Sequence, residues 1–133
     1  MGEILLNYAE AQFYLGNNST AIQYLDMVRV RAGLPKLPAS LAGSELESRI
    51  RNERQIELCL EGHRYYDVRR WKIADVTENK PLMGVVINKN SSTGVKTYTY
   101  TQVQTRVFKP QHYLLPIPKS EINRTSLTQN LGY

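Results

Sequence analysis

The sequence predicts a mainly α-helical protein of the α+β class, in which a helix hairpin and a capped helix pair precede a small β-hairpin and an irregular C-terminal region. Three observations indicate this class. Apolar residues recur at helical spacing up to about residue 73, and extended patterns replace them afterwards. Glycines stand where the helices should end. The 133 residues, of which 41% are hydrophobic and 22% charged, are enough to bury one ordinary core.

Residues 1–34 are predicted to form two antiparallel helices. Apolar residues recur at helical spacing up to Gly16, whose left-handed conformation would end the first helix. Asn18 or Ser19 can cap a second amphipathic helix, which would stop at Gly33. Small side chains let two helices approach closely, as in tetratricopeptide-like pairs, and the small residues of this segment are Ala9, Ala11, Ala21 and Ala32.

Residues 44–73 are predicted to form a second helix pair. Ser44 and Glu47 have the spacing of a capping box, in which each side chain satisfies a free backbone amide at the start of a helix. The helix would then run to about Glu61 and be closed by Gly62. A shorter amphipathic helix would occupy the remainder of the segment.

The pattern becomes extended in residues 82–133. Val85–Ile87 and Val95–Val103 are rich in β-branched and aromatic residues, and the turn-rich segment 88–94 separates them, so a β-hairpin is predicted. The prolines farther along cannot donate to a central ladder and favour irregular extended chain. Ser120 is expected to cap one last helical turn.

Charge and hydropathy exclude several classes of protein. The net charge is +5, with ten basic and nine acidic residues up to position 74 and seven and three after it. The basic residues of the second half are scattered singly, so no nucleic-acid partner is expected. The longest apolar stretch, Met83–Ile87, is far shorter than the roughly 20 residues of a membrane-spanning helix. The first residues lack the basic region of a signal peptide.

A dense pattern of charges extends from Glu53 to Trp71. Glu53, Glu57 and Glu61 are spaced to share one helical stripe, where like charges repel by about a few tenths of a kcal/mol per pair. Arginines lie beside this stripe and again beyond Gly62, where the chain can turn back. We therefore predict a partly buried network of carboxylates and guanidinium groups that joins two helices. Its predicted members are Glu53, Arg54, Glu57, Glu61, Arg64, Asp67, Arg70 and Trp71.

Two chemical interpretations compete with this structural one. Glu53, Glu57 and Glu61 could supply the acid and nucleophile of a glycosidase, but nearby arginines favour the ionised form of a carboxylate, whereas an acid catalyst must hold its proton. Cys59 and His63 are four residues apart and could be a nucleophile pair or two metal ligands. No further ligand has matching spacing, which favours a buried small hydrophobe beside a helix-end histidine. No catalytic residue, metal site or cofactor is predicted.

The same segment resembles the signature of a known family. The pattern ER..EL..EGHR..D..RW, read from Glu53 to Trp71, is similar to that of the SusD/RagB family of outer-membrane nutrient-binding lipoproteins. The family has proline where Leu131 stands, and more often has Trp-Phe at positions 65–66, which here are two tyrosines. Four other segments agree with the family in the same order: EILLNYAEAQFYLG (3–16), A...LD.VR.RAGLP (21–35), YLLPIPKSEI (113–122) and QNLGY (129–133).

The resemblance implies that residues 1–133 are the C-terminal region of a non-enzymatic, cell-surface glycan-binding lipoprotein. Residues 1–34 would be the last tetratricopeptide-like helix pair, 44–73 the signature helices and 82–133 the hairpin and extended tail. Family members are lipid-anchored on the outer face of the outer membrane. They capture oligosaccharides and pass them to a TonB-dependent transporter. An oligosaccharide and such a transporter are therefore the expected partners.

The resemblance identifies no binding residue, because the ligand-contacting aromatics vary within the family. Tyr98 and Tyr100 share one face of the predicted strand and are the candidates for stacking on sugar rings; the alternative is that they pack against helices or cross-strand neighbours. The outer face of the 3–33 helix pair is expected to pack on upstream helices or on another copy of the chain. The alternative function is a free-standing helix-repeat adaptor that binds a protein through the concave side of this pair.

Overall fold

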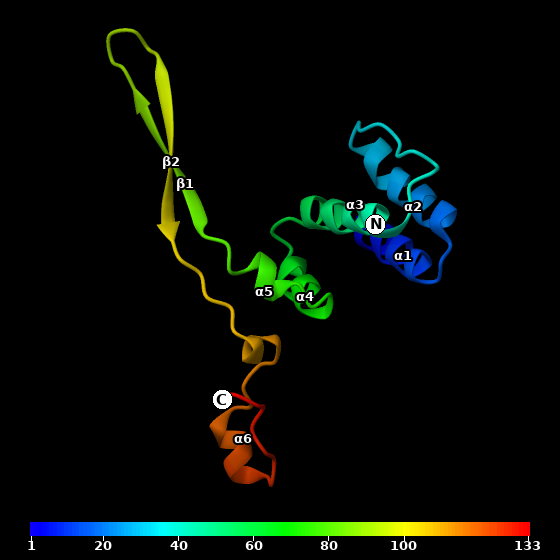
Figure 1. Ribbon diagram of the computed structural model, residues 1–133, viewed down its shortest axis with the longest axis vertical. Coiled ribbons are helices and arrows are strands. Elements are labelled where there is room, and N and C mark those ends of the chain that lie inside the picture. The colour runs from blue at the N-terminus through cyan, green and yellow to red at the C-terminus, as the bar shows by residue number, and fades with distance from the viewer. The chain divides into compact units, whose positions relative to one another are not determined.

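The computed structural model describes residues 1–133 as two compact units, Met1–Asp67 and Val68–Tyr133 (Figure 1). Helices predominate and one two-stranded antiparallel sheet accompanies them, so the predicted mainly α class is confirmed. None of the helices combines the length and the apolar character that crossing a bilayer demands. The helices are α1 (Gly2–Tyr14), α2 (Asn18–Arg31), α3 (Gly43–Glu57), α4 (His63–Arg70), α5 (Ala74–Thr77) and α6 (Lys119–Arg124); the strands are β1 (Leu82–Lys89) and β2 (Lys96–Gln104).

The first unit begins with the predicted helix hairpin. α1 ends before Gly16 and α2 before Gly33, and both glycines have the expected positive φ, +82° and +76°. The predicted caps of α2 were wrong. The helix already begins at Asn18, so Asn17 is its N-cap and Ser19 lies in its first turn. The Asn17 side chain caps nothing and donates instead to the Gln12 side-chain oxygen, at 2.8 Å.

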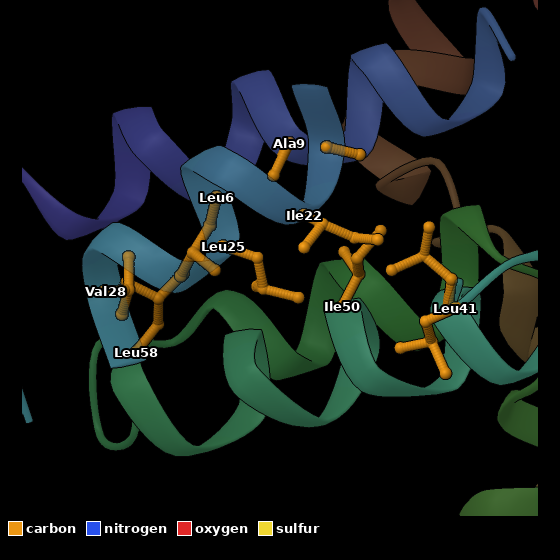
Figure 2. Packing of buried hydrophobic residues seen from close by; sticks show 10 residues of the cluster. Leu6, Ala9, Ile22, Leu25, Val28, Leu41, Ile50 and Leu58 are labelled. Atoms are coloured by element: carbon orange, nitrogen blue, oxygen red, sulfur yellow. The ribbon is translucent and has the colours of Figure 1, made fainter. Parts of the chain in front are cut away.

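The core of the first unit lies between α1, α2 and α3. Figure 2 shows α1 and α2 directing side chains towards α3, with Leu58 closing one end of the cluster and Leu41 the other. The apolar stripe on the outer side of α1, which its C-cap Leu15 continues, remains solvent-exposed, with Ile4 at 67% and Leu15 at 72%. The buried cluster consists of Leu6, Ala9, Ala21, Ile22, Leu25, Val28, Leu41, Leu46, Ile50 and Leu58.

The limits of α3 differ from the prediction at both ends. Its N-cap is Ala42, and no side chain caps it, so the expected Ser44–Glu47 capping box does not form. Ser44 already lies within the first turn, and the Glu47 carboxylate binds Tyr14 and Arg51 instead. At the other end the helix stops at Glu57, four residues before the predicted end. A turn follows in which Leu60 has a φ of +68° and is fully exposed.

The helix predicted for the end of the 44–73 segment ends early, and a further short helix lies beyond the segment. α4 ends at Arg70, Lys72 adopts a φ of +55°, and the short α5 follows. The second unit has a much smaller core than the first. It consists of Val68, Ala74 and Phe108, against which Ile73 and Tyr113 pack.

Side-chain amides hold much of the irregular chain in the second unit. Asn79 accepts a hydrogen bond from the Phe108 amide at 2.6 Å and donates to the Phe108 carbonyl at 3.2 Å. Gln129 binds the backbone of Ile117 in the same two-sided manner, at 2.8 and 2.9 Å. Each side-chain amide thus satisfies the backbone N–H and carbonyl of one residue, as the backbone of a neighbouring strand would.

β1 and β2 form the predicted hairpin (Figure 1). β1 is longer than the predicted Val85–Ile87, and β2 is shifted by one residue from the predicted Val95–Val103. Their register pairs Val85 with Tyr100 and Ile87 with Tyr98. After the strands, a 3-10 helix at Pro110–Tyr113 was not predicted. The last helical turn exists, as α6, but it begins at Lys119, so Ser120 lies inside it and makes no cap.

Candidate functional site

Arg54 is the centre of a buried ion-pair network in the first unit. Its side chain, on the last turns of α3, donates to both carboxylate oxygens of Asp67 on α4, with Nε–Oδ2 at 3.0 Å and Nη2–Oδ1 at 3.1 Å. The third nitrogen, Nη1, donates to the Asn7 side-chain oxygen at 2.6 Å, and the Glu10 carboxylate lies 3.6 Å from Nε. Arg54 and Asp67 are nearly inaccessible to solvent. One guanidinium therefore joins α1, α3 and α4.

Two glutamates of the predicted stripe on α3 form ion pairs with arginines of α2. Glu53 pairs with Arg29 and Glu57 with Arg31. We expected arginines beside the stripe or beyond Gly62 to neutralise these carboxylates, and that assignment was wrong. α2 packs against α3, and its last turn brings Arg29 and Arg31 within reach. In the sequence, these two arginines could have been identified by their position in the last turn of the second helix.

Glu61 and Arg64 stand outside this network. Because α3 ends at Glu57, Glu61 does not continue the helical stripe; it lies exposed in the turn. Arg64 is half-buried on α4 and makes no ion pair. The two remaining predicted members lie in the second unit, where the Arg70 guanidinium stacks 4.7 Å from the centre of the Trp71 ring.

Cys59 was predicted to be buried, and it is exposed. It follows the last turn of α3, where the chain has already left the helix, so it does not share a helical face with His63. The His63 imidazole lies 3.8 Å from the Glu3 carboxylate. The structure brings no three His, Cys, Asp or Glu side chains together in a metal-ligating arrangement.

Two tyrosines that the sequence did not single out are tied to carboxylates. The Tyr14 hydroxyl donates to Glu47 at 2.8 Å, and partial burial raises its pKa; Arg51 opposes this rise in pKa, while Glu47 adds to it. In the second unit the Tyr113 hydroxyl donates to Asp75 at 2.6 Å, and desolvation followed by this hydrogen bond raises the pKa of Tyr113.

Tyr98 and Tyr100 lie on one face of the hairpin. Residues that oppose each other in an antiparallel pair project to the same side, so both rings share a face with Val85 and Ile87. Tyr98 is 58% exposed and Tyr100 71% exposed. No strand residue of β2 is buried. This face of the hairpin therefore exposes two tyrosine rings beside the apolar side chains of Val85 and Ile87.

The chain is similar to known proteins in sequence and in structure. The SusD family model matches residues 1–133. The chain belongs to the SusD family. It is 30% identical to each of two SusD-like proteins of Formosa agariphila, P25 over 92% of the chain and P2 over 98%. It superposes on the crystal structure of a SusD-like protein from Bacteroides fragilis with a TM-score of 0.84 and 40% identity over 99% of the chain.

This SusD-family chain is much shorter than the proteins it matches. It covers 21% and 24% of the two Formosa proteins and 25% of the Bacteroides protein. The similarity to the solved structure covers 99% of the chain and so extends over the residues of both units.

Proposed function

We propose that the chain is part of a cell-surface glycan-binding lipoprotein, which captures oligosaccharides and delivers them to a TonB-dependent outer-membrane transporter. The family match along the whole chain, together with the close superposition on a SusD-like protein, supports this function. The protein acts by binding, without catalysis, on the extracellular face of the outer membrane. The carboxylates that a glycosidase would use support this view, because Glu53 and Glu57 are engaged by arginines.

Within the chain, we assign sugar contact to Tyr98 and Tyr100. A flat ring that is more than half exposed can stack on the apolar face of a sugar, and two rings on one strand face offer two adjacent stacking positions. Two stacked aromatic rings gain about 0.5–1.5 kcal/mol, and we take the same range for a ring on a sugar, which corresponds to about a two- to tenfold change in affinity.

Isothermal titration calorimetry with a panel of glucan, mannan and galactan oligosaccharides tests this proposal. We expect the full-length protein to bind at least one of them, and Tyr98→Ala or Tyr100→Ala to weaken binding about two- to tenfold. Tyr66→Ala is the matched control, because that ring is 68% exposed but lies on α4. Equal affinity in all three variants would remove the tyrosines from the site, and hydrolysis that depends on Glu57 would contradict a purely binding function.

One observation is compatible with a second function, as a protein-binding adaptor. The outer stripe of α1, with Ile4, Tyr8 and Leu15, remains exposed. In the glycan-binding protein this stripe would pack on preceding helices or on another copy of the chain. In an adaptor it would belong to a free-standing helix pair. The coding region distinguishes the two: an upstream reading frame with a lipoprotein signal and further helix pairs supports the glycan-binding protein, whereas a native start at Met1 supports the adaptor.

A further inference from the structure

Within residues 1–133, the β1–β2 ribbon is exposed on both faces. Every residue of β2 is exposed, and Gly84 is the only residue of β1 that is even partly buried. Val85 and Ile87 are 47% and 57% exposed beneath the two tyrosine rings. An isolated two-stranded hairpin is at best marginally stable in water, and a third strand or a packed helix is normally required. The ribbon is therefore suited to pair with a further strand.

Apart from Lys96 at its first residue, the outer edge of β2 carries none of the features that prevent strand addition. One edge of β2 pairs with β1, so its other edge presents backbone amides and carbonyls without a strand partner. Protected edges usually carry lysine, proline or a bulge. From Thr97 to Thr105 the chain has no charged residue and no proline, and the one irregularity of the register lies between Leu82 and Met83.

The sequence of β2 is complementary to itself. Residues 97–101 read Thr-Tyr-Thr-Tyr-Thr, which is the same in both directions. Antiparallel pairing with a second copy about Thr99 would set Tyr98 opposite the second copy's Tyr100. It would also set each outer threonine of this segment opposite another threonine. Aromatic pairs and threonine pairs are favourable across strands. Lys96 would face a glutamine, so no like charges oppose each other.

We propose that β2 pairs antiparallel with β2 of a second copy of the chain, with a two-fold axis at Thr99, to form a four-stranded sheet. Such an interface is isologous, because the same edge serves both copies. β1 is less suitable for this pairing, since it contains Gly84, the register shift, and no comparable symmetry. All four tyrosines of the pair would lie on one face, because a two-fold axis perpendicular to a sheet preserves the face.

Disulfide trapping tests the register. In a Cys59→Ser background, Thr99→Cys should form a covalent dimer on mild oxidation, because directly opposed Cα atoms lie about 4.5–5.5 Å apart. Thr101→Cys alone should not, since its counterpart is displaced by four residues, or about 13 Å. Mixing Thr97→Cys and Thr101→Cys chains should restore the cross-link. Efficient cross-linking of Thr101→Cys alone, or of Val86→Cys on β1, would overturn the proposed pairing.

Sedimentation velocity tests the dimer without a covalent bond. We expect the 133-residue chain to sediment at about twice its 15.3 kDa mass at tens of micromolar concentration, and Thr99→Lys and Thr99→Glu each to sediment as monomers. An equimolar mixture of these two variants should dimerise again, because opposite charges then meet at the axis. Thr101→Lys is the matched control and should retain more dimer than Thr99→Lys. A monomeric wild-type chain, or a mixture that stays monomeric, would refute the proposal.

Discussion

Replacing Asp67 with alanine should lower the free energy of unfolding of the first unit by about 3 kcal/mol. The Asp67 carboxylate is 3% exposed and accepts two hydrogen bonds from the Arg54 guanidinium, which is 4% exposed. Loss of one partner of a buried ion pair costs about 3–5 kcal/mol, because the other charge remains buried. The Glu10 carboxylate, 3.6 Å from Arg54, still opposes that charge, so we expect the lower end of this range.

Urea denaturation followed by circular dichroism at 222 nm measures this loss. Arg64→Ala is the matched control on the same helix, and it should change the free energy of unfolding by less than about 1 kcal/mol because Arg64 makes no ion pair. Glu57→Ala should also cost no more than about 1 kcal/mol, since its partner Arg31 has a side chain that is 62% exposed.

Two further variants separate the charge from the packing. Asp67→Asn keeps one acceptor oxygen and should cost about 1–2 kcal/mol, which provides a folded protein even if the alanine variant does not fold. Combining Arg54→Met with Asp67→Leu should recover part of the loss, because apolar replacement of both members of a buried pair is often neutral, while the buried Glu10 carboxylate also loses Arg54. If Asp67→Ala proved as mild as Arg64→Ala, the network would not stabilise the unit and the reasoning would fail.

Two other predictions concern Tyr14 and Leu60. The pKa of Tyr14 is raised above 10.0, chiefly by burial, so the unfolded tyrosine ionises first as the pH rises and stability is lost above about pH 10. Tyr14→Phe should therefore lose less stability than the wild type between about pH 9 and pH 11, as shown by denaturation midpoints; equal losses would contradict this. Leu60→Gly should raise the free energy of unfolding by about 0.5–1 kcal/mol, because Leu60 has a φ of +68° and buries nothing. A destabilised Leu60→Gly variant would show that the leucine side chain packs.

Local patterns predicted the helix hairpin and the β-hairpin because each depends on residues close in the sequence. Gly16 and Gly33 mark chain reversals that only a left-handed residue makes easily, and both adopt that conformation. The end of α3 could not be found in this way, because residues 58–61 contain no helix breaker. The helix ends where the chain must turn so that Asp67 can return to Arg54, which is a tertiary requirement.

In the candidate site, too, the features set by local sequence were predicted and those set by tertiary packing were not. The period of two in β2 was sufficient to place Tyr98 and Tyr100 on one face, since strand geometry is local. The partners of Glu53 and Glu57 depend on which helix packs beside α3, and charge spacing along one helix carries no such information. Cys59 was misplaced for a related reason, because its exposure follows from the early end of α3.

The small core of the second unit has a thermodynamic consequence. Only Val68, Ala74 and Phe108 are buried there, and the amides of Asn79 and Gln129 hold much of the remaining chain. Both the heat-capacity increment and the denaturant sensitivity of unfolding grow with the apolar surface that becomes exposed. The second unit should therefore contribute little to either quantity, and a calorimetric or urea transition of residues 1–133 will chiefly report the helices of the first unit.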